Sequence, residues 1–154
     1  MSISDRRYNY DYKRGLRYQE FIAAYFGVGS GLEDDFEEAN DLEIKLDDKY
    51  AKTGNLFIET AERPTTKFPW KPAGPFHPYP KRSYLIGDRK KAWVFDNTQL
   101  KNLISNRSRV TNASDTAIGV LMPVYEASEI ARIFKFTAEK GQLFLPVAKP
   151  WLWA

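Results

Sequence analysis

The segment 41–59, DLEIKLDDKYAKTGNLFIE, constrains the fold most strongly, because apolar and charged side chains alternate through its first half. Glu43, Lys45 and Asp47 occupy every second position, and leucine or isoleucine fills the positions between them. Successive side chains of a β-strand point to opposite faces of a sheet. The alternation therefore predicts a strand whose apolar face enters a core. Its other face would carry two carboxylates with an ammonium group between them.

The charge distribution singles out the same region. Residues 33–48 hold nine of the 20 acidic residues and one of the 23 basic residues, so the rest of the chain has 22 basic and 11 acidic residues. A basic surface is typical of nucleic-acid-binding proteins. Carboxylates in the middle of such a surface would repel phosphates unless they hold divalent cations. The acidic run alone is equally compatible with a solvated loop, and the alternation from Leu42 onward favours the strand.

Composition excludes several kinds of functional site. The 154 residues include no cysteine and one histidine, His77. Disulfide scaffolds, thiolate zinc sites, cysteine nucleophiles and histidine-rich metal sites are therefore excluded. No apolar run is long enough to span a bilayer, and residues 1–15 lack the apolar core of a signal peptide. We therefore expect a cytoplasmic protein of one domain with no membrane partner.

Hydrophobic periodicity and turn residues predict the remaining elements. Residues 1–13 are expected to form a polar and aromatic arm without regular structure. Six prolines within 63–80 predict an ordered, irregular loop packed over a cleft. The strand at 41–47 is expected to pair with 32–36 in a hairpin through 37–40. The other expected elements are helices at 15–26, 97–105 (capped by Asp96) and 126–134, and strands at 56–60, 84–86, 92–95 and 118–124.

Carboxylates and a lysine are the groups that remain to carry chemistry, because no phosphate-binding glycine loop, HExxH or GxSxG motif is present. Converging carboxylates bind Mg²⁺ through oxygen ligands, and a neighbouring lysine can position an attacking water and stabilise developing charge. The expected hairpin would bring Asp34 or Asp35 close to Glu43 and Lys45. The pattern therefore favours hydrolysis of a phosphodiester.

The spacing D-x(7)-E-x-K, formed by Asp35, Glu43 and Lys45, resembles the core motif of the PD-(D/E)XK nuclease superfamily. Asp34 stands where that superfamily usually has proline. The run EIKLDDKYAKTGNLFIE also resembles a segment of phage and bacterial members. The resemblance covers about residues 15–105.

The resemblance implies an α/β fold with a restriction-endonuclease-like core, in which a small mixed β-sheet is flanked by helices. Residues 1–154 would then form a single nuclease-like domain, and 106–154 would be an extension of it. The implied activity is that of a Mg²⁺-dependent (or Mn²⁺-dependent) DNA endonuclease in the cytoplasm of a bacterium or of a phage-infected host cell.

Carried onto this sequence, the resemblance makes Asp35 and Glu43 metal ligands and Lys45 the lysine that positions water. Glu20, on the first helix, would complete the catalytic site. Asp47 shares a face with Glu43 and Lys45, so it is a further candidate ligand.

A rival assignment takes Glu43 as the first acid and Glu59 as the second metal ligand. Lys45 is then displaced from its usual place, because Thr60 and Ala61 follow Glu59 and no lysine does. A third interpretation is that the alternating charges only form surface pairs, each contributing less than about 1 kcal/mol.

DNA is the partner that the resemblance implies. Asn55 lies in a Thr-Gly-Asn sequence typical of a turn, where the backbone could also approach a phosphate. Nucleases of this kind are commonly homodimers, and the aromatic residues near Trp151 are a candidate interface. The residues expected to contact nucleic acid are Asn55, Lys81, Arg82, Lys90, Lys91, Arg107 and Arg109.

Two other classes of function stay open. One is a catalytically silent DNA-binding or protein-interaction module that keeps the nuclease-like fold. The other is a phage structural or inhibitory protein whose acidic run, 33–48, binds a basic partner.

Overall fold

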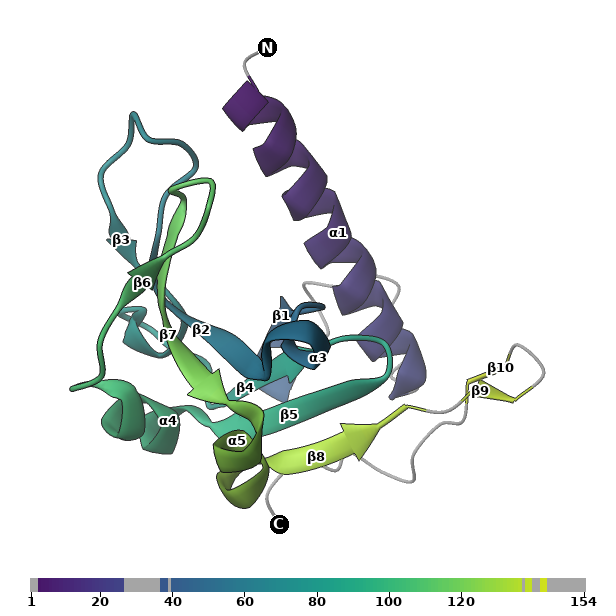
Figure 1. The fold of residues 1–154 in the computed structure, drawn as a ribbon. Helices are drawn as coiled ribbons and strands as arrows, with labels where there is room; N and C mark the ends of the chain where they lie inside the picture. Colours follow the sequence, from purple (N-terminus) through teal and green to yellow (C-terminus); the bar gives the residue numbers. More distant parts are fainter. Residues whose placement is uncertain (1–2, 27–36, 39, 137, 140–141, 144–154) are drawn as a thin grey trace.

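A computed structural model describes residues 3–26, 37–38, 40–136, 138–139 and 142–143 (Figure 1). The hairpin strand expected at 32–36 and the aromatic tail lie outside these residues. The helices are α1 (Ile3–Tyr25), α3 (Tyr50–Thr53), the 3-10 turn η1 (Gly74–Phe76), α4 (Asn97–Ile104) and α5 (Val124–Ile130). The strands are β1 (Leu42–Leu46), β2 (Asn55–Glu62), β3 (Lys71–Pro72), β4 (Ser83–Gly87), β5 (Lys91–Asp96), β6 (Val110–Thr111), β7 (Ala117–Pro123), β8 (Arg132–Lys135), β9 (Ala138–Glu139) and β10 (Gln142–Leu143).

The strands form two four-stranded sheets and a separate pair, β9 and β10. The first sheet has the order β1-β4-β5-β8, in which β1 runs parallel to β4 and the other neighbours are antiparallel. The second sheet has the order β3-β2-β7-β6 and is antiparallel throughout. A mixed α/β architecture with helices flanking the sheets is therefore confirmed, and the second sheet is an addition to the single small sheet expected from the sequence.

Both faces of the first sheet are buried along its central strands, β4 and β5, whereas most of β8 is exposed. One face packs against α1 through a cluster that includes Tyr18 and Ile22 of the helix and Leu42 and Ile44 of β1. The opposite face packs against the second sheet, α4 and α5. Every residue of the central strand β4 is accordingly buried, as is usual for strands covered on both sides. The first sheet is thus the middle layer of the fold.

The end of β1 is fastened to β2 by Asp47. Its Oδ1 atom accepts a hydrogen bond from the backbone N–H of Lys49, and its Oδ2 atom accepts one from that of Phe57, both at 2.9 Å. Between them lies α3, where a loop was expected, and this helical turn ends at Gly54 with φ +77°. Two strands that belong to different sheets are therefore held side by side.

Strand β2 contains a bulge at Thr60. Glu59 pairs with Gly119 of β7, and Ala61 pairs with the adjacent residue, Ile118. Thr60 therefore has no pairing partner on β7. Its carbonyl accepts the backbone N–H of Ala73 from the proline-rich segment at 3.0 Å. The bulge therefore anchors that segment, as expected for an ordered loop.

Gly74 lets the proline-rich segment lie directly on β2. Its φ is +55°, and a Cβ atom there would be 2.5 Å from the carbonyl oxygen of Glu59 and 3.5 Å from the ring of Tyr84. Left-handed backbone is costly for residues other than glycine. Gly74 thus permits a close approach that no other residue would allow without strain.

Two expectations about secondary structure are wrong. Residues 3–14 are helical and continue into the expected helix, because hydrogen bonds extend a helix from a packed half even without an apolar face. The expected pairing of 41–47 with 32–36 lies outside the described residues; residues 37, 38 and 40 are helical, and within the described chain β1 pairs with β4. Residues 132–135 form β8 instead of a helical end, because they add to the edge of β5. The strands at 84–86 and 92–95 and the Asp96 cap are confirmed.

We predict that Gly74→Ala destabilises the protein by at least about 1 to 2 kcal/mol, from the left-handed backbone and the contact with Glu59. Gly15→Ala in α1 is the matched control, because a Cβ atom there meets nothing within 4 Å. Alanine is the better helix former, so this variant should be more stable by about 0.5 to 1 kcal/mol. Urea unfolding measures both, and equal effects of the two substitutions would contradict the close approach at Gly74.

Candidate functional site

One ammonium group and two carboxylates meet where β1 and β2 lie side by side. The Nζ atom of Lys45 is 3.6 Å from Oε1 of Glu43 and 3.3 Å from Oε2 of Glu59. The three side chains are 29%, 21% and 23% exposed, so the group is mostly withdrawn from water. We call these three residues the charged cluster. It corresponds to the rival assignment, in which Glu59 is the second acid.

The alternation of β1 explains why these charges lie inside the protein. Leu42 and Ile44 pack against α1, so Glu43 and Lys45 point to the opposite side of the strand. That side faces the second sheet, which brings Glu59. Since β1 is the edge strand of its sheet, the cluster lies at the rim between the two sheets. Glu43 and Lys45 therefore lie between the two sheets. They do not form the solvated surface pairs that were one interpretation of the sequence.

Tyr84 forms the floor of the cluster. It is paired with Glu43 in the parallel register of β1 and β4, so the two side chains share one face of the sheet. Tyr84 is fully buried, and its hydroxyl oxygen has no partner at hydrogen-bond geometry within the described chain. Burial raises the pKa of the phenol well above its usual value, and the carboxylates of Glu43 and Glu59 raise it further. Tyr84 is therefore a neutral phenol at the buried end of the cluster.

The electrostatics of the cluster are set by burial and by mutual attraction. Burial raises the pKa of Glu43, and the attraction of Lys45 only partly offsets this. Burial alone would lower the pKa of Lys45, but the carboxylates of Glu59 and Glu43 outweigh it, so the pKa of the lysine is raised. The ammonium group therefore stays charged, whereas an ionised Glu43 is held at a cost in stability.

Both ion pairs of Lys45 are long, so the carboxylates of the cluster can still accept a hydrogen bond or bind a cation. Charge-assisted N–H···O bonds are usually about 2.7 to 2.9 Å long, and both ion-pair distances here are longer. Oε2 of Glu59 is buried and makes no hydrogen bond to any described residue. Buried carboxylate oxygens that face one point suit a hard cation such as Mg²⁺.

The described residues supply two carboxylates to this point. They contain no group of three His, Cys, Asp or Glu side chains placed to hold a metal ion. Mg²⁺ is commonly held by one or two carboxylates, with water and phosphate oxygens as its other ligands. Glu43 and Glu59 offer oxygen ligands of the kind that this ion takes.

The other predicted site residues lie elsewhere. Asp35 is outside the described residues. Glu20 is exposed on α1, which packs on the face of β1 opposite to Glu43. Both oxygens of Asp47 accept backbone hydrogen bonds, as described above, which gives this carboxylate a positioning role for the cluster.

The predicted nucleic-acid contacts do not form one patch. Lys81 and Arg82 precede β4, whereas Lys90 and Lys91 follow it, and a five-residue strand separates the two pairs by roughly 17 Å. Lys81 is in an ion pair with Glu38, and Arg107 with Glu126. Asn55 closes the turn after α3 by accepting the hydroxyl of Thr53 on its carbonyl. Arg109 lies over the ring of Phe76.

Sequence reasoning missed Tyr84 and Gly74. Tyr84 stands in an unbroken apolar strand, SYLIG, where its hydroxyl gives no periodic signal. Gly74 is one of several turn residues among prolines, and its contact with β2 depends on tertiary structure. The register of β1 against β4 would have identified Tyr84, but parallel pairing across about 40 residues leaves no local pattern.

Comparison with protein-family models, with curated proteins and with solved structures finds no match to this chain. Within the described ranges, no helix combines the length and the apolar composition needed to cross a bilayer.

We predict that Glu43→Gln increases stability near neutral pH in the absence of divalent cations. Because the folded-state pKa of Glu43 is raised, the stability linked to it is fully present below about pH 4.5 and is lost as the pH rises through the folded pKa. Glutamine cannot ionise, so the variant avoids this loss. The gain in urea midpoint over the wild type should vanish in acid.

Glu126→Gln provides a control of opposite sign. The hydrogen bond from Arg107 lowers the pKa of Glu126, so its contribution is present above about pH 4.5 and is lost as the pH falls through the folded pKa. This variant should be less stable than the wild type at neutral pH. Destabilisation by both substitutions at neutral pH would show that Glu43 is a structural carboxylate.

Proposed function

We propose that the protein is a Mg²⁺-dependent or Mn²⁺-dependent DNA endonuclease that hydrolyses the phosphodiester backbone. The observation that carries this proposal is the charged cluster. The ammonium of Lys45 lies 3.6 Å and 3.3 Å from carboxylates of two different sheets, and the nearer oxygen, Oε2 of Glu59, is buried and makes no hydrogen bond to a described residue besides this ion pair. Removing charges from water is unfavourable, so such a group is more typical of a functional site than of a stabilising one.

Glu43 and Glu59 would hold the metal ion. When bound, Mg²⁺ supplies positive charge against the phosphate and lowers the pKa of a coordinated water. The donor set fits this ion, since both side chains offer oxygen atoms and Oε2 of Glu59 is buried with no hydrogen-bond partner in the described chain.

Lys45 acts as a fixed positive charge. Its pKa is raised, so it does not accept a proton from water at neutral pH. The ammonium group instead donates hydrogen bonds to the attacking water and to a phosphate oxygen, where negative charge develops. Tyr84, buried beneath, keeps bulk water from the cluster.

We further propose that residues 15–105 form a core related to the PD-(D/E)XK nucleases. Three features support this: a helix packed on the strand that carries the E-x-K sequence, a second acid on the next strand, and the mixed sheet that follows. Glu59 then serves as the second acid, and Lys45 occupies the position between the two acids. A homodimer remains part of this proposal.

The main alternative is a catalytically silent DNA-binding or interaction module. It is favoured by one observation: the described residues bring two acidic groups, not three, to the cluster. Under this alternative Lys45 neutralises two buried carboxylates and no metal ion enters.

Cleavage of plasmid and branched DNA with Mg²⁺ or Mn²⁺ tests the proposal. We expect Lys45→Ala to reduce the cleavage rate by about 10² to 10³-fold, the effect of removing one group that stabilises developing charge. Glu43→Gln and Glu59→Gln should abolish metal-dependent cleavage and weaken Mn²⁺ binding measured by titration. Glu129→Gln, an exposed carboxylate on α5, is the matched control and should cleave like the wild type.

Asp35→Asn separates the two assignments of the second acid. If Glu59 completes the site, Asp35→Asn retains Mn²⁺ binding and Glu59→Gln loses it. A folded wild-type protein that binds DNA but nicks neither substrate with either metal ion would eliminate the enzyme and leave the binding module.

A further inference from the structure

A groove begins one residue beyond the charged cluster. It has a volume of about 360 Å³ and is lined by Thr60 of β2, by Trp70, Lys71 and Phe76 of the proline-rich segment, and by Arg109. Thr60 follows Glu59 directly on β2. The groove and the charged cluster are thus joined by neighbouring residues of β2.

Aromatic rings and positive charges alternate in the groove wall. The guanidinium of Arg63 lies 4.0 Å from the ring centroid of Trp70. The guanidinium of Arg109 and the ammonium of Lys101 lie 5.2 Å and 5.5 Å from the ring centroid of Phe76. These distances are within the range of cation–π attraction. Rings held next to cations offer a stacking surface beside binding positions for phosphate.

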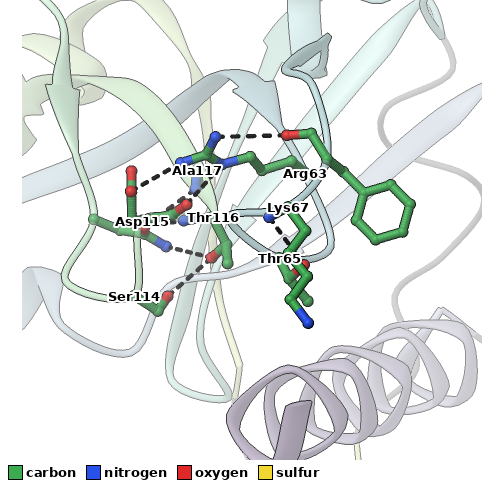
Figure 2. A network of polar contacts seen from close by, with 9 residues as sticks. Arg63, Thr65, Lys67, Ser114, Asp115, Thr116 and Ala117 are labelled. Atoms are coloured by element: carbon green, nitrogen blue, oxygen red, sulfur yellow. Dashed lines mark hydrogen bonds and ion pairs between the residues drawn. The ribbon is translucent and has the colours of Figure 1, made fainter. Parts of the chain in front are cut away.

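Arg63, whose guanidinium lies over the ring of Trp70, belongs to a polar network shown in Figure 2. The side chain of Arg63 donates to the carbonyl of Asp115, forms a 2.8 Å ion pair with its carboxylate, and reaches the carbonyl of Phe68. Its backbone N–H donates to the carbonyl of Thr116 at 2.9 Å. These bonds join the proline-rich segment to the turn before β7, so the groove wall exists before any ligand binds.

The groove carries a net positive charge. The carboxylate of Asp115 is already paired with Arg63. Glu62 lies opposite Lys71 in the pairing of β2 with β3, and its carboxylate acts on Glu43 and Lys45 of the charged cluster. The guanidinium of Arg109 donates to backbone carbonyls, which leaves its charge uncompensated, and neither it nor Lys101 forms an ion pair with a described carboxylate. An anionic, aromatic ligand matches this lining.

We propose that this groove binds single-stranded DNA, with an unpaired base stacked on Trp70 or Phe76 and its phosphates beside Lys71 and Arg109. Bases in a duplex have both faces covered by their neighbours, so only an unpaired base can stack on a protein ring. The substrate of the proposed nuclease would then be single-stranded or branched DNA. That last step rests on the proposed function, whereas strand binding by the groove does not.

Fluorescence anisotropy in EDTA tests the groove apart from cleavage. The probes are a labelled oligothymidylate, a strand of equal length with abasic positions, and a duplex of equal length. The wild type should bind the oligothymidylate about tenfold more tightly than the abasic strand, since one stacked base contributes about 1 to 3 kcal/mol. Trp70→Leu should bind both strands alike, and Trp70→Phe should restore the preference. The affinity of each protein for the duplex should be unchanged.

Two further variants separate stacking from charge. Lys71→Gln should lower the slope of log K against log salt concentration by about 0.7 for the single strand, because one phosphate contact is lost. Tyr79→Leu is the matched aromatic control, because Tyr79 is 85% exposed and does not line the groove. It should bind like the wild type.

Three results would overturn the inference: no preference of the wild type for the base-containing strand, an equal loss of duplex and single-strand affinity in Trp70→Leu, or an equal loss in Tyr79→Leu. If Trp70→Leu does not fold, the comparison of the two strands with wild-type protein still decides. Strand binding without cleavage would reject the proposed nuclease and keep the groove. Cleavage without strand preference would reject strand binding by the groove and keep the proposed nuclease.

Discussion

The burial of both faces of the first sheet is the constraint on which the rest of the structure depends. Leu42 and Ile44 must face α1, because that face of β1 completes the core beneath the helix. The residues between them are then turned toward the second sheet, whatever their charge. Glu43 and Lys45 are thus placed between layers by the apolar half of the same strand. The charged cluster is a direct product of period-two geometry in a strand that lies between two packed layers.

Attraction within the charged cluster offsets part of the free energy needed to bury its charges. Isolated charges in a protein interior are unfavourable by several kcal/mol each, and partners within about 4 Å recover much of this. Lys45 serves both Glu43 and Glu59, so the group has one positive and two negative charges and remains one cation short of balance. Burial is the main cause of the raised pKa of Glu43, and the carboxylates of Glu59 and Glu62 raise it further. A bound divalent ion would supply the missing positive charge and one further unit, which links the electrostatics of the folded protein to the activity we propose.

Local patterns predicted the strands 41–47 and 56–60 by alternation, the strands 84–86 and 92–95 as apolar runs on either side of a turn, and the following helix by its cap at Asp96. Residues 3–14 and 132–135 were misassigned, since the first extends a helix packed elsewhere and the second completes a sheet edge. Within the site, Glu43 and Lys45 share a face by spacing alone. Their meeting with Glu59 and Tyr84 depends on how two sheets pack, which no local pattern encodes.

The bulge at Thr60 divides β2 into two parts with separate constraints. Before it, residues 55–59 keep the strict alternation that the core and the charged cluster require. After it, the pairing with β7 resumes one residue out of step, and the strand serves the groove. A change of length or sequence in the proline-rich segment can therefore be absorbed beyond the bulge without altering the register of Glu59. The lining of the groove can therefore vary while the position of Glu59 in the charged cluster stays fixed.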